Sequence, residues 1–262
     1  MIRTTTTLIA SAALLAFGTT ASAAPAVALV GEKTLAMFDT DTRAITGTMD
    51  VSGVDRLVGI DFRPADNTLV GVTDANVVFT IDPATGAASE LSTMDTPLDM
   101  GDMPVIVDFN PMADRLRYMT GTTNHRVNVD TGEVTVDGDL SFVEADMHAG
   151  EEPAIVAAAY INSLGKPEST AMYNIDGTIV ALIQQTAPND GTLASIGKLG
   201  IENPASNYAF DISADAELNN TAWLVNGTTL FTVDLETGAA TAVGMIEGVD
   251  GEIRDIAIAP PM

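Results

Sequence analysis

The stretch LVGIDFRPADNTLVGVTDANVVFTIDPATGAASEL, residues 57–91, decides the fold class of this chain. Short runs rich in Val, Leu, Ile, Phe and Thr are separated by turn signals, PADN at 64–67 and DPATG at 82–86. Runs of this length between Pro, Asx and Gly turns predict antiparallel β-strands joined by tight turns. We therefore expect four strands here, over Leu57–Phe62, Leu69–Thr73, Val77–Ile81 and Ala87–Leu91.

The first of these strands recurs about every 50 residues along the chain. Its five copies are LVGIDF (57–62), VIVDF (105–109), AIVAAAY (154–160), NYAFDI (207–212) and IRDIAI (253–258). A repeat of this length that contains several strands is typical of a β-propeller, in which each repeat forms one blade. The sequence therefore predicts an all-β protein with a propeller fold.

The two ends of the repeat array predict how the ring closes. The first unit supplies only three strands, expected over Val27–Val30, Leu35–Phe38 and Ala44–Met49. The last copy, Ile253–Ile258, stands alone, and pairing it with the N-terminal three completes one four-stranded blade without an open edge. We therefore expect five blades. The alternative is a sixth blade formed by Thr93–Pro104 or Ser141–Glu152, although neither segment alternates apolar and polar residues.

Three of the predicted hairpin turns end in Thr-Gly, at 82–86, 130–132 and 234–238. We expect the Asp of each turn to accept backbone N–H groups and the Gly to adopt a positive φ. Hairpins of this length need such residues whatever the protein does, so the interpretation is structural. No EF-hand spacing accompanies them, and these turns are therefore not predicted to bind calcium.

Residues 1–23 have the pattern of a secretory signal. A charge at Arg3 and a Thr run precede an apolar stretch over Leu8–Phe17, and Ala-Ser-Ala at 21–23 is a small-x-small cleavage motif. The apolar stretch is too short to span a bilayer. We expect cleavage after Ala23, a secreted or periplasmic protein, and a single propeller domain over residues 24–262.

Composition narrows the classes of partner. The chain carries 36 Asp and Glu against 11 Lys and Arg, a formal net charge of −25. Such a surface repels nucleic acids and anionic lipids, so neither is an expected partner. The chain has no Cys, so its stability must come from packing and not from disulfides. We expect a monomer with no membrane span whose partner is a small molecule or a protein.

The innermost strands carry an unusual set of carboxylates. Aligning the five copies places Asp61, Asp108, Asp211 and Asp255 in register, with Ala159 at the same position of the fourth unit. These strands surround the axis of a propeller, and an unpaired buried carboxylate is costly. One interpretation is a ring of Asp side chains that bind backbone N–H groups of neighbouring blades. The other is an axial metal site, with Ca²⁺ as the cofactor because every ligand would be oxygen.

The scarce positive charge gathers in the third unit. Arg115, Arg117 and Arg126 lie there together with Asp108 and Asn110. Alternation places Arg115 and Arg117 on one face of their strand, so both can reach one carboxylate or one ligand. One hypothesis is an anion-binding pocket near the axis lined by these five residues. The alternative is that the arginines form structural ion pairs with buried Asp.

Several runs resemble the secreted bacterial family known as domain of unknown function 4394 (DUF4394). They include DFNPMADRLR at 108–117, RVN at 126–128 followed by DTG at 130–132, PNDGTL at 188–193 and GKLG at 197–200. The resemblance extends over essentially the whole of residues 24–262. It implies a propeller-like fold and an exported protein, and it implies no particular activity, ligand or catalytic residue.

Familiar catalytic motifs are absent from the sequence. It has no Gly-x-Ser-x-Gly elbow, no zinc-type His pair and no phosphate-binding loop. The favoured hypothesis is therefore a non-enzymatic extracytoplasmic binding or scaffold protein, with no catalytic residue assigned. The alternative is a cation-dependent hydrolase or lyase that acts on a small anionic metabolite or a sugar through the axial carboxylates.

Overall fold

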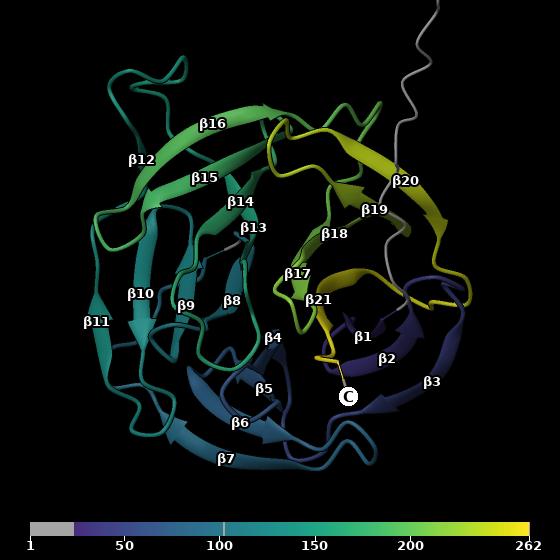
Figure 1. Ribbon diagram of the computed structural model, residues 1–262. Coiled ribbons are helices and arrows are strands. Elements are labelled where there is room, and N and C mark those ends of the chain that lie inside the picture. The colour runs from purple at the N-terminus through teal and green to yellow at the C-terminus, as the bar shows by residue number, and fades with distance from the viewer. Residues whose placement is uncertain (1–23, 102, 262) are drawn as a thin grey trace, which may run out of the picture.

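The computed structural model describes residues 24–101 and 103–261, so the predicted signal peptide over 1–23 lies outside the described residues. The described chain forms five β-sheets arranged as blades around a central axis (Figure 1). The prediction of an all-β, five-bladed propeller is confirmed. Among the described residues, no helix is both long and apolar enough to cross a membrane.

Each blade is numbered here by its order around the ring, and its strands are given from the axis outward. Blade 1 contains β21 (Ile253–Ile258), β1 (Pro25–Val30), β2 (Thr34–Asp39) and β3 (Ile45–Asp50). Blade 2 contains β4 (Leu57–Arg63), β5 (Thr68–Thr73), β6 (Val77–Ile81) and β7 (Ala88–Thr93). Blade 3 contains β8 (Val105–Asn110), β9 (Arg115–Thr120), β10 (Thr123–Val127) and β11 (Val134–Val136). Blade 4 contains β13 (Ile155–Tyr160), β14 (Met172–Asp176), β15 (Ala181–Ala187), β16 (Thr192–Lys198) and β12 (Ser141–Phe142). Blade 5 contains β17 (Tyr208–Ala214), β18 (Asn220–Asn226), β19 (Thr229–Val233) and β20 (Ala240–Met245).

The C-terminal strand closes the ring as predicted. Strand β21 pairs antiparallel with β1, with Ala28 opposite Ile256 and Ala26 opposite Ile258. Figure 1 shows this last strand, in yellow, inside the purple N-terminal strands. The alternative of six blades is wrong for the described residues, because the segment from Ser141 contributes only the two-residue β12. That strand pairs parallel with β16 and extends blade 4.

The hydrophobic core is divided into five clusters, one between each pair of neighbouring blades. Trp223 of blade 5, for example, belongs to the cluster shared with blade 1, and Phe109 of blade 3 belongs to the cluster shared with blade 2. Strands buried on both faces need apolar residues at successive positions, which explains the nearly continuous apolar runs of the inner strands. The ring is thus held by side-chain packing between blades.

The Thr-Gly turns behave as predicted with one exception. Asp82 and Asp234 accept backbone N–H groups two residues ahead, at 2.9 Å from the nitrogen in both turns. In the turn of blade 3 the accepting residue is Asn128, which lies two residues before Asp130 and receives its N–H at 3.1 Å. The prediction that Asp130 caps this turn is therefore wrong. Its carboxylate is free to pair with an arginine instead.

Candidate functional site

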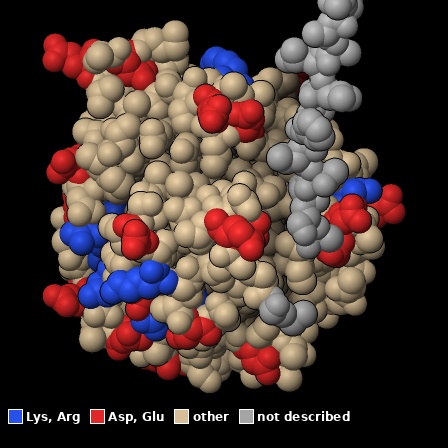
Figure 2. Space-filling model, viewed as in Figure 1, with Lys and Arg blue, Asp and Glu red and all other residues tan. Residues whose placement is uncertain are grey.

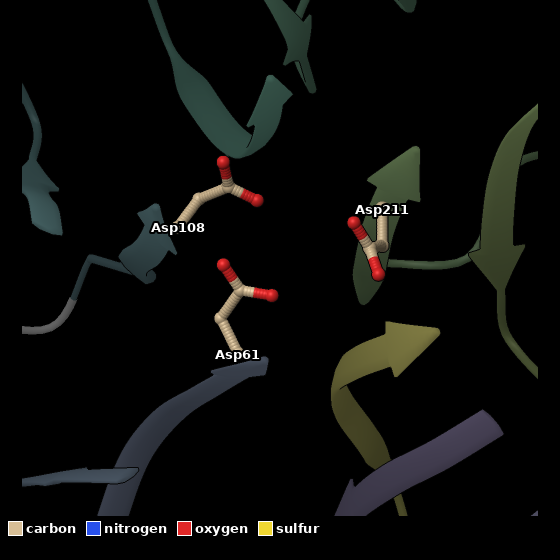
Figure 3. A group of neighbouring side chains, drawn as sticks. All are labelled: Asp61, Asp108 and Asp211. Carbon is tan, nitrogen blue, oxygen red and sulfur yellow. The ribbon is translucent and has the colours of Figure 1, made fainter. Parts of the chain in front are cut away.

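Three carboxylates meet on the axis of the ring. Asp61, Asp108 and Asp211 come from the inner strands of blades 2, 3 and 5, and each offers an oxygen within 4.8 Å of the others. Figure 3 shows the three side chains pointing toward one another in the middle of the ring. All three are buried, with 4–8% of each residue exposed. The sequence predicted four carboxylates at this level, and the structure brings three of them together.

Each carboxylate of this axial triad also ties its blade to a neighbour. Asp61 accepts the N–H of Phe109 at 2.7 Å, Asp108 that of Tyr160 at 3.0 Å, and Asp211 that of Ile258 at 2.5 Å. Hydrogen bonds of this kind favour the ionised form and hold the strands at fixed height. The interpretation of the Asp residues as links between blades therefore describes real contacts, and one oxygen of each carboxylate is engaged by them.

Asp255 lies outside the triad. Its carboxylate accepts the N–H of Ile60 at 2.8 Å, whereas Asp211 receives the N–H of Ile258, three residues beyond Asp255. In blade 3 the corresponding donor is one residue beyond Asp108, so Asp255 sits two residues earlier than the alignment of the repeats places it. Because alternate residues share a face, this offset moves its side chain one layer along the axis.

The electrostatics of the axis favour protons or a cation. Burial raises the pKa of Asp61 and of Asp108 well above the ordinary value of 3.8, and neighbouring carboxylates raise both pKa values further. Burial also raises the pKa of Asp211 to about 6 and that of Asp255 to about 8. No arginine or lysine forms an ion pair with the triad among the described residues. Like charges this close ionise together only when something positive joins them.

The space beside the triad is small. Asp61 and Asp211 border a cavity of about 20 Å³ near the end of the axis where the inner strands finish. This volume holds about one water molecule, since roughly 10–15 Å³ is needed for each. The triad can therefore hold an ion or water in this cavity, but a sugar does not fit there.

The five residues of the predicted anion pocket lie on one face of blade 3. Asp108, Arg117 and Arg126 stand directly opposite one another on adjacent strands, and Asn110 stands opposite Arg115. This face is turned toward blade 4, as the bond from Tyr160 to Asp108 shows. None of the five lines the cavity beside the triad or the larger cavity described below.

Arg117 is held by an ion pair in the core between blades 3 and 4. Its residue is 1% exposed, and its Nη1 donates to Asp137 at 2.7 Å and to Asn124 at 2.8 Å. Its Nε donates to the Tyr160 hydroxyl at 3.2 Å, and Nη2 to the Asn189 amide oxygen at 3.2 Å. This Arg117 cluster supports the structural interpretation of the arginine. Its acidic partner, Asp137, lies in the loop after β11 and could not be predicted from the strand pattern.

The other predicted residues have separate partners. Arg126 also binds Asp137, with Nε at 2.7 Å and Nη2 at 3.0 Å from the carboxylate. Arg115 donates to the carbonyl of Asp114 at 2.8 Å. Asn110 accepts the backbone N–H groups of residues 112 and 113 and so caps the β8–β9 turn. The structure thus brings Arg117 and Arg126 to one carboxylate, whereas Arg115 and Asn110 form hydrogen bonds within the β8–β9 turn.

A second arginine site joins blades 2 and 3 at the surface. Arg63 donates to Asp114 at 2.8 and 2.6 Å and to Asp130 at 2.9 Å, so its planar group spans two carboxylates. Figure 2 shows Lys and Arg side chains gathered at the lower left, where these blades meet in Figure 1. The hydrogen bonds from Arg63 lower the pKa of Asp130.

A larger cavity opens at the opposite end of the axis, where the inner strands begin. Its volume is about 230 Å³, and blades 1, 2, 3 and 5 contribute to its lining. Val105 and Tyr208 are the first residues of their inner strands, and Val58 is the second residue of β4. Arg254 and Arg56 contribute positive charge to the lining. Sequence reasoning missed this site, because its residues belong to four separate repeats and share no motif.

The comparisons with known proteins establish the family. The chain belongs to the family described as Domain of unknown function (DUF4394), whose model matches residues 34–257. No curated protein matches the sequence. The resemblance seen in the motifs is therefore confirmed, and it brings no activity with it.

One solved structure shares the fold of this chain. A protein of unknown function from Bacteroides thetaiotaomicron is 14% identical, with a TM-score of 0.54 over 89% of this chain and 66% of that protein. Another protein of unknown function, from Bacteroides caccae, is 15% identical, with a TM-score of 0.46 over 87% of this chain and 76% of that protein. This chain spans about two thirds of the first protein's length, and at such identity the likeness shows a shared fold alone.

Proposed function

We propose that this protein is an exported, non-enzymatic binding protein that holds a small molecule in the axial cavity where the inner strands begin. The observation that carries the proposal is the cavity itself, about 230 Å³ in volume and built by four blades. Binding sites are concave and combine apolar surface with a few polar or charged groups, and this cavity combines apolar side chains with the charged groups of Arg56 and Arg254. The rigid ring fixes the positions of its walls.

Filling the cavity tests the proposal. Val105 lines it from the start of β8, and Val105→Phe places a larger side chain there while keeping a residue suited to a strand. We expect ligand-observed NMR with a mixture of small acids, amines and neutral compounds to detect binding to the natural protein and not to the variant. Val136→Phe, at a position 60% exposed on β11, is the matched control. Binding that survives Val105→Phe contradicts the proposal.

Export rests on the signal-like residues 1–23. Expression with the full N-terminus in a Gram-negative host should give protein in the periplasm or medium that begins at Ala24, as N-terminal sequencing would show. Protein that begins at Met1 and stays in the cytoplasm contradicts export.

A second candidate function uses the axial triad. A Ca²⁺ ion held by Asp61, Asp108 and Asp211 would supply the positive charge that these carboxylates lack, and it would be the cofactor of a hydrolase or lyase. The triad favours a bound ion, but the adjoining cavity of about 20 Å³ leaves no room for a substrate beside it. This geometry supports the binding function above the enzymatic one.

Calcium titration distinguishes a triad that binds an ion from a triad that holds protons. If the triad binds the ion, 1 mM Ca²⁺ should raise the melting temperature of dialysed protein at pH 8, and Asp108→Asn should remove the increase. Lack of any increase in the natural protein would show that protons, not a cation, occupy the triad. Asp66→Asn, in an exposed turn, controls for unspecific binding to the acidic surface.

A further inference from the structure

The charged group that points to the ligand class is Arg254. It follows Ile253 at the start of β21 and lines the large axial cavity. Its Nε donates to the carbonyl of Gly31 at 2.6 Å, and its Nη2 donates to the carbonyls of Leu57 at 2.5 Å and Glu32 at 3.4 Å. These acceptors are dipoles, not charges. They anchor the guanidinium without neutralising it.

Charges of both signs lie near Arg254, since Arg56 lowers its pKa whereas the carboxylates of Glu32, Asp255 and Glu252 raise it. Arg56, also in the lining, pairs with Glu32 at 3.1 Å, and both of these side chains are largely exposed. Among the described residues no carboxylate lies within ion-pair distance of Arg254. Burial, and after it the neighbouring Arg56, lower the pKa of Arg254, as expected where positive charge is partly removed from water. An anion in the cavity would relieve that cost.

The remaining lining limits what kind of anion fits. Met100, Met103, Pro104, Val58, Val105 and Tyr208 supply apolar surface. Asp74 and Glu252 are exposed and also border the cavity, so a second or third negative charge on a ligand would be repelled. The volume of about 230 Å³ falls below the roughly 300–1,000 Å³ of sites for drug-sized ligands, which favours a small molecule.

We infer that the axial cavity binds a small monoanion, a carboxylate with an apolar body, whose charged end meets the guanidinium of Arg254. The apolar body lies against the methionines, valines and Tyr208. This inference rests on the proposed binding function, and it adds the ligand class and the residue that selects it. Because Nε and Nη2 already donate to carbonyls, the donor left for the carboxylate is Nη1, whose N–H groups have no acceptor among the described residues.

Calorimetric titration with four related probes tests the charge. Phenylacetate carries one negative charge, phenylacetamide none, 2-phenylethylamine one positive charge and phenylmalonate two negative charges. We expect phenylacetate to bind most tightly, with the amide weaker by roughly tenfold or more, as for loss of one charge-assisted hydrogen bond. The dianion should also bind more weakly, because Asp74 and Glu252 repel its second charge. Equal or tighter binding of the amide or the amine overturns the inference, although the cavity would then still be a binding site.

Substitutions of Arg254 test whether this residue binds the carboxylate. Arg254→Gln should weaken phenylacetate binding by about tenfold or more, while Arg254→Lys, which keeps the charge, should lose less. Because Arg254 also anchors three carbonyls, thermal melts must show that both variants fold, and Arg56→Gln offers a second test with a more exposed arginine. Lys166→Gln makes the same change in net charge at an exposed residue outside the lining and should leave binding unchanged.

The outcomes separate this inference from the proposed function. Phenylacetate binding that Arg254→Gln leaves intact in a folded protein overturns the role of Arg254. Failure of all four probes overturns the ligand class, and the NMR screen with Val105→Phe then decides whether the cavity binds anything. Binding of neutral compounds in that screen, lost in Val105→Phe, would keep the binding function without the monoanion.

Discussion

The Arg117 cluster and the axial triad are both buried and charged, yet their charges are arranged in opposite ways. In the cluster, Arg117 faces Asp137 at 2.7 Å and its other N–H groups meet neutral oxygens. In the triad, three carboxylates face one another without an ion-pair partner among the described residues. The first arrangement satisfies its charges within the protein, whereas the second depends on protons or an added cation.

Whether a buried charge has an ion-pair partner therefore distinguishes structural residues from candidate functional residues better than the type of residue does. A buried charge with its partner in place tells us how the blades are joined. A buried charge without one marks a place where pH or a ligand can act. Arg254 at the other end of the axis is only half-buried, but like the triad it has no ion-pair partner among the described residues.

The largest effect should come from Arg117→Ala. Removing this side chain leaves the carboxylate of Asp137 buried with only the more exposed Arg126, so we expect a loss of about 3–5 kcal/mol in the free energy of unfolding. Urea denaturation measures it. Arg115→Ala on the same strand is the control and should change stability by less than about 1 kcal/mol, because its bond is to one carbonyl.

The same variant decides the anion-pocket hypothesis for blade 3. An Arg117→Ala protein of unchanged stability that no longer binds anions would favour the pocket over the structural ion pair. Unchanged stability together with unchanged binding would contradict both interpretations.

The pH dependence of stability should report the triad. Its carboxyl groups have higher pKa values in the folded protein than the ordinary 3.8, so the folded state binds more protons above pH 4. The free energy of unfolding should therefore fall as the pH rises from about 4 toward 8, and Asp211, with a pKa of about 6, accounts for about 3 kcal/mol of the loss. Urea titrations in EDTA at several pH values measure it.

Below pH 4 the free energy of unfolding should instead fall as the pH falls. The pKa of Asp130 is lowered by its hydrogen bonds from Arg63, so the stability that this pair contributes is lost as the pH falls through that pKa. We expect maximum stability at about pH 4. A protein that is most stable at pH 8 in EDTA would show that the triad does not hold its protons.

A pair of isosteric substitutions sharpens the comparison. Asp108→Asn removes one of the three like charges while its amide oxygen can still accept the Tyr160 N–H. We expect it to raise the free energy of unfolding at pH 8 by about 1–2 kcal/mol and to change it little at pH 4. Asp137→Asn is the same chemical change in the Arg117 cluster and should destabilise the protein at pH 8. Equal changes in the free energy of unfolding for Asp108→Asn and Asp137→Asn would show that the carboxylates of the triad and of the Arg117 cluster are not in different electrostatic environments.

The smallest effect should come from Arg126→Gln. The Arg126 side chain is 29% exposed, and Arg117 continues to pair with Asp137 when it is removed. We expect a loss of about 0.5–1 kcal/mol, close to that of a surface ion pair. A loss as large as that of Arg117→Ala would mean that the two arginines act as one unit, which a double-mutant cycle would show.

Much of the fold followed from local chemistry in the sequence. The repeat at 57–91 and its copies contain their own strand and turn signals, and the lone strand Ile253–Ile258 left one way to complete a blade. These features depend on neighbours along the chain or across one hairpin, so one sequence suffices to predict them.

The site depended on contacts between blades, which the sequence does not encode locally. Neighbouring inner strands are not paired in one sheet, so side-chain packing sets their relative height, and Asp255 lies two residues away from its aligned position. For the same reason, only the tertiary structure shows that Asp137 is the partner of Arg117. The axial cavity that Arg254 lines is likewise visible only in the tertiary structure. Alternation within a strand predicts which face a side chain occupies, but the packing of the next blade decides what it meets there.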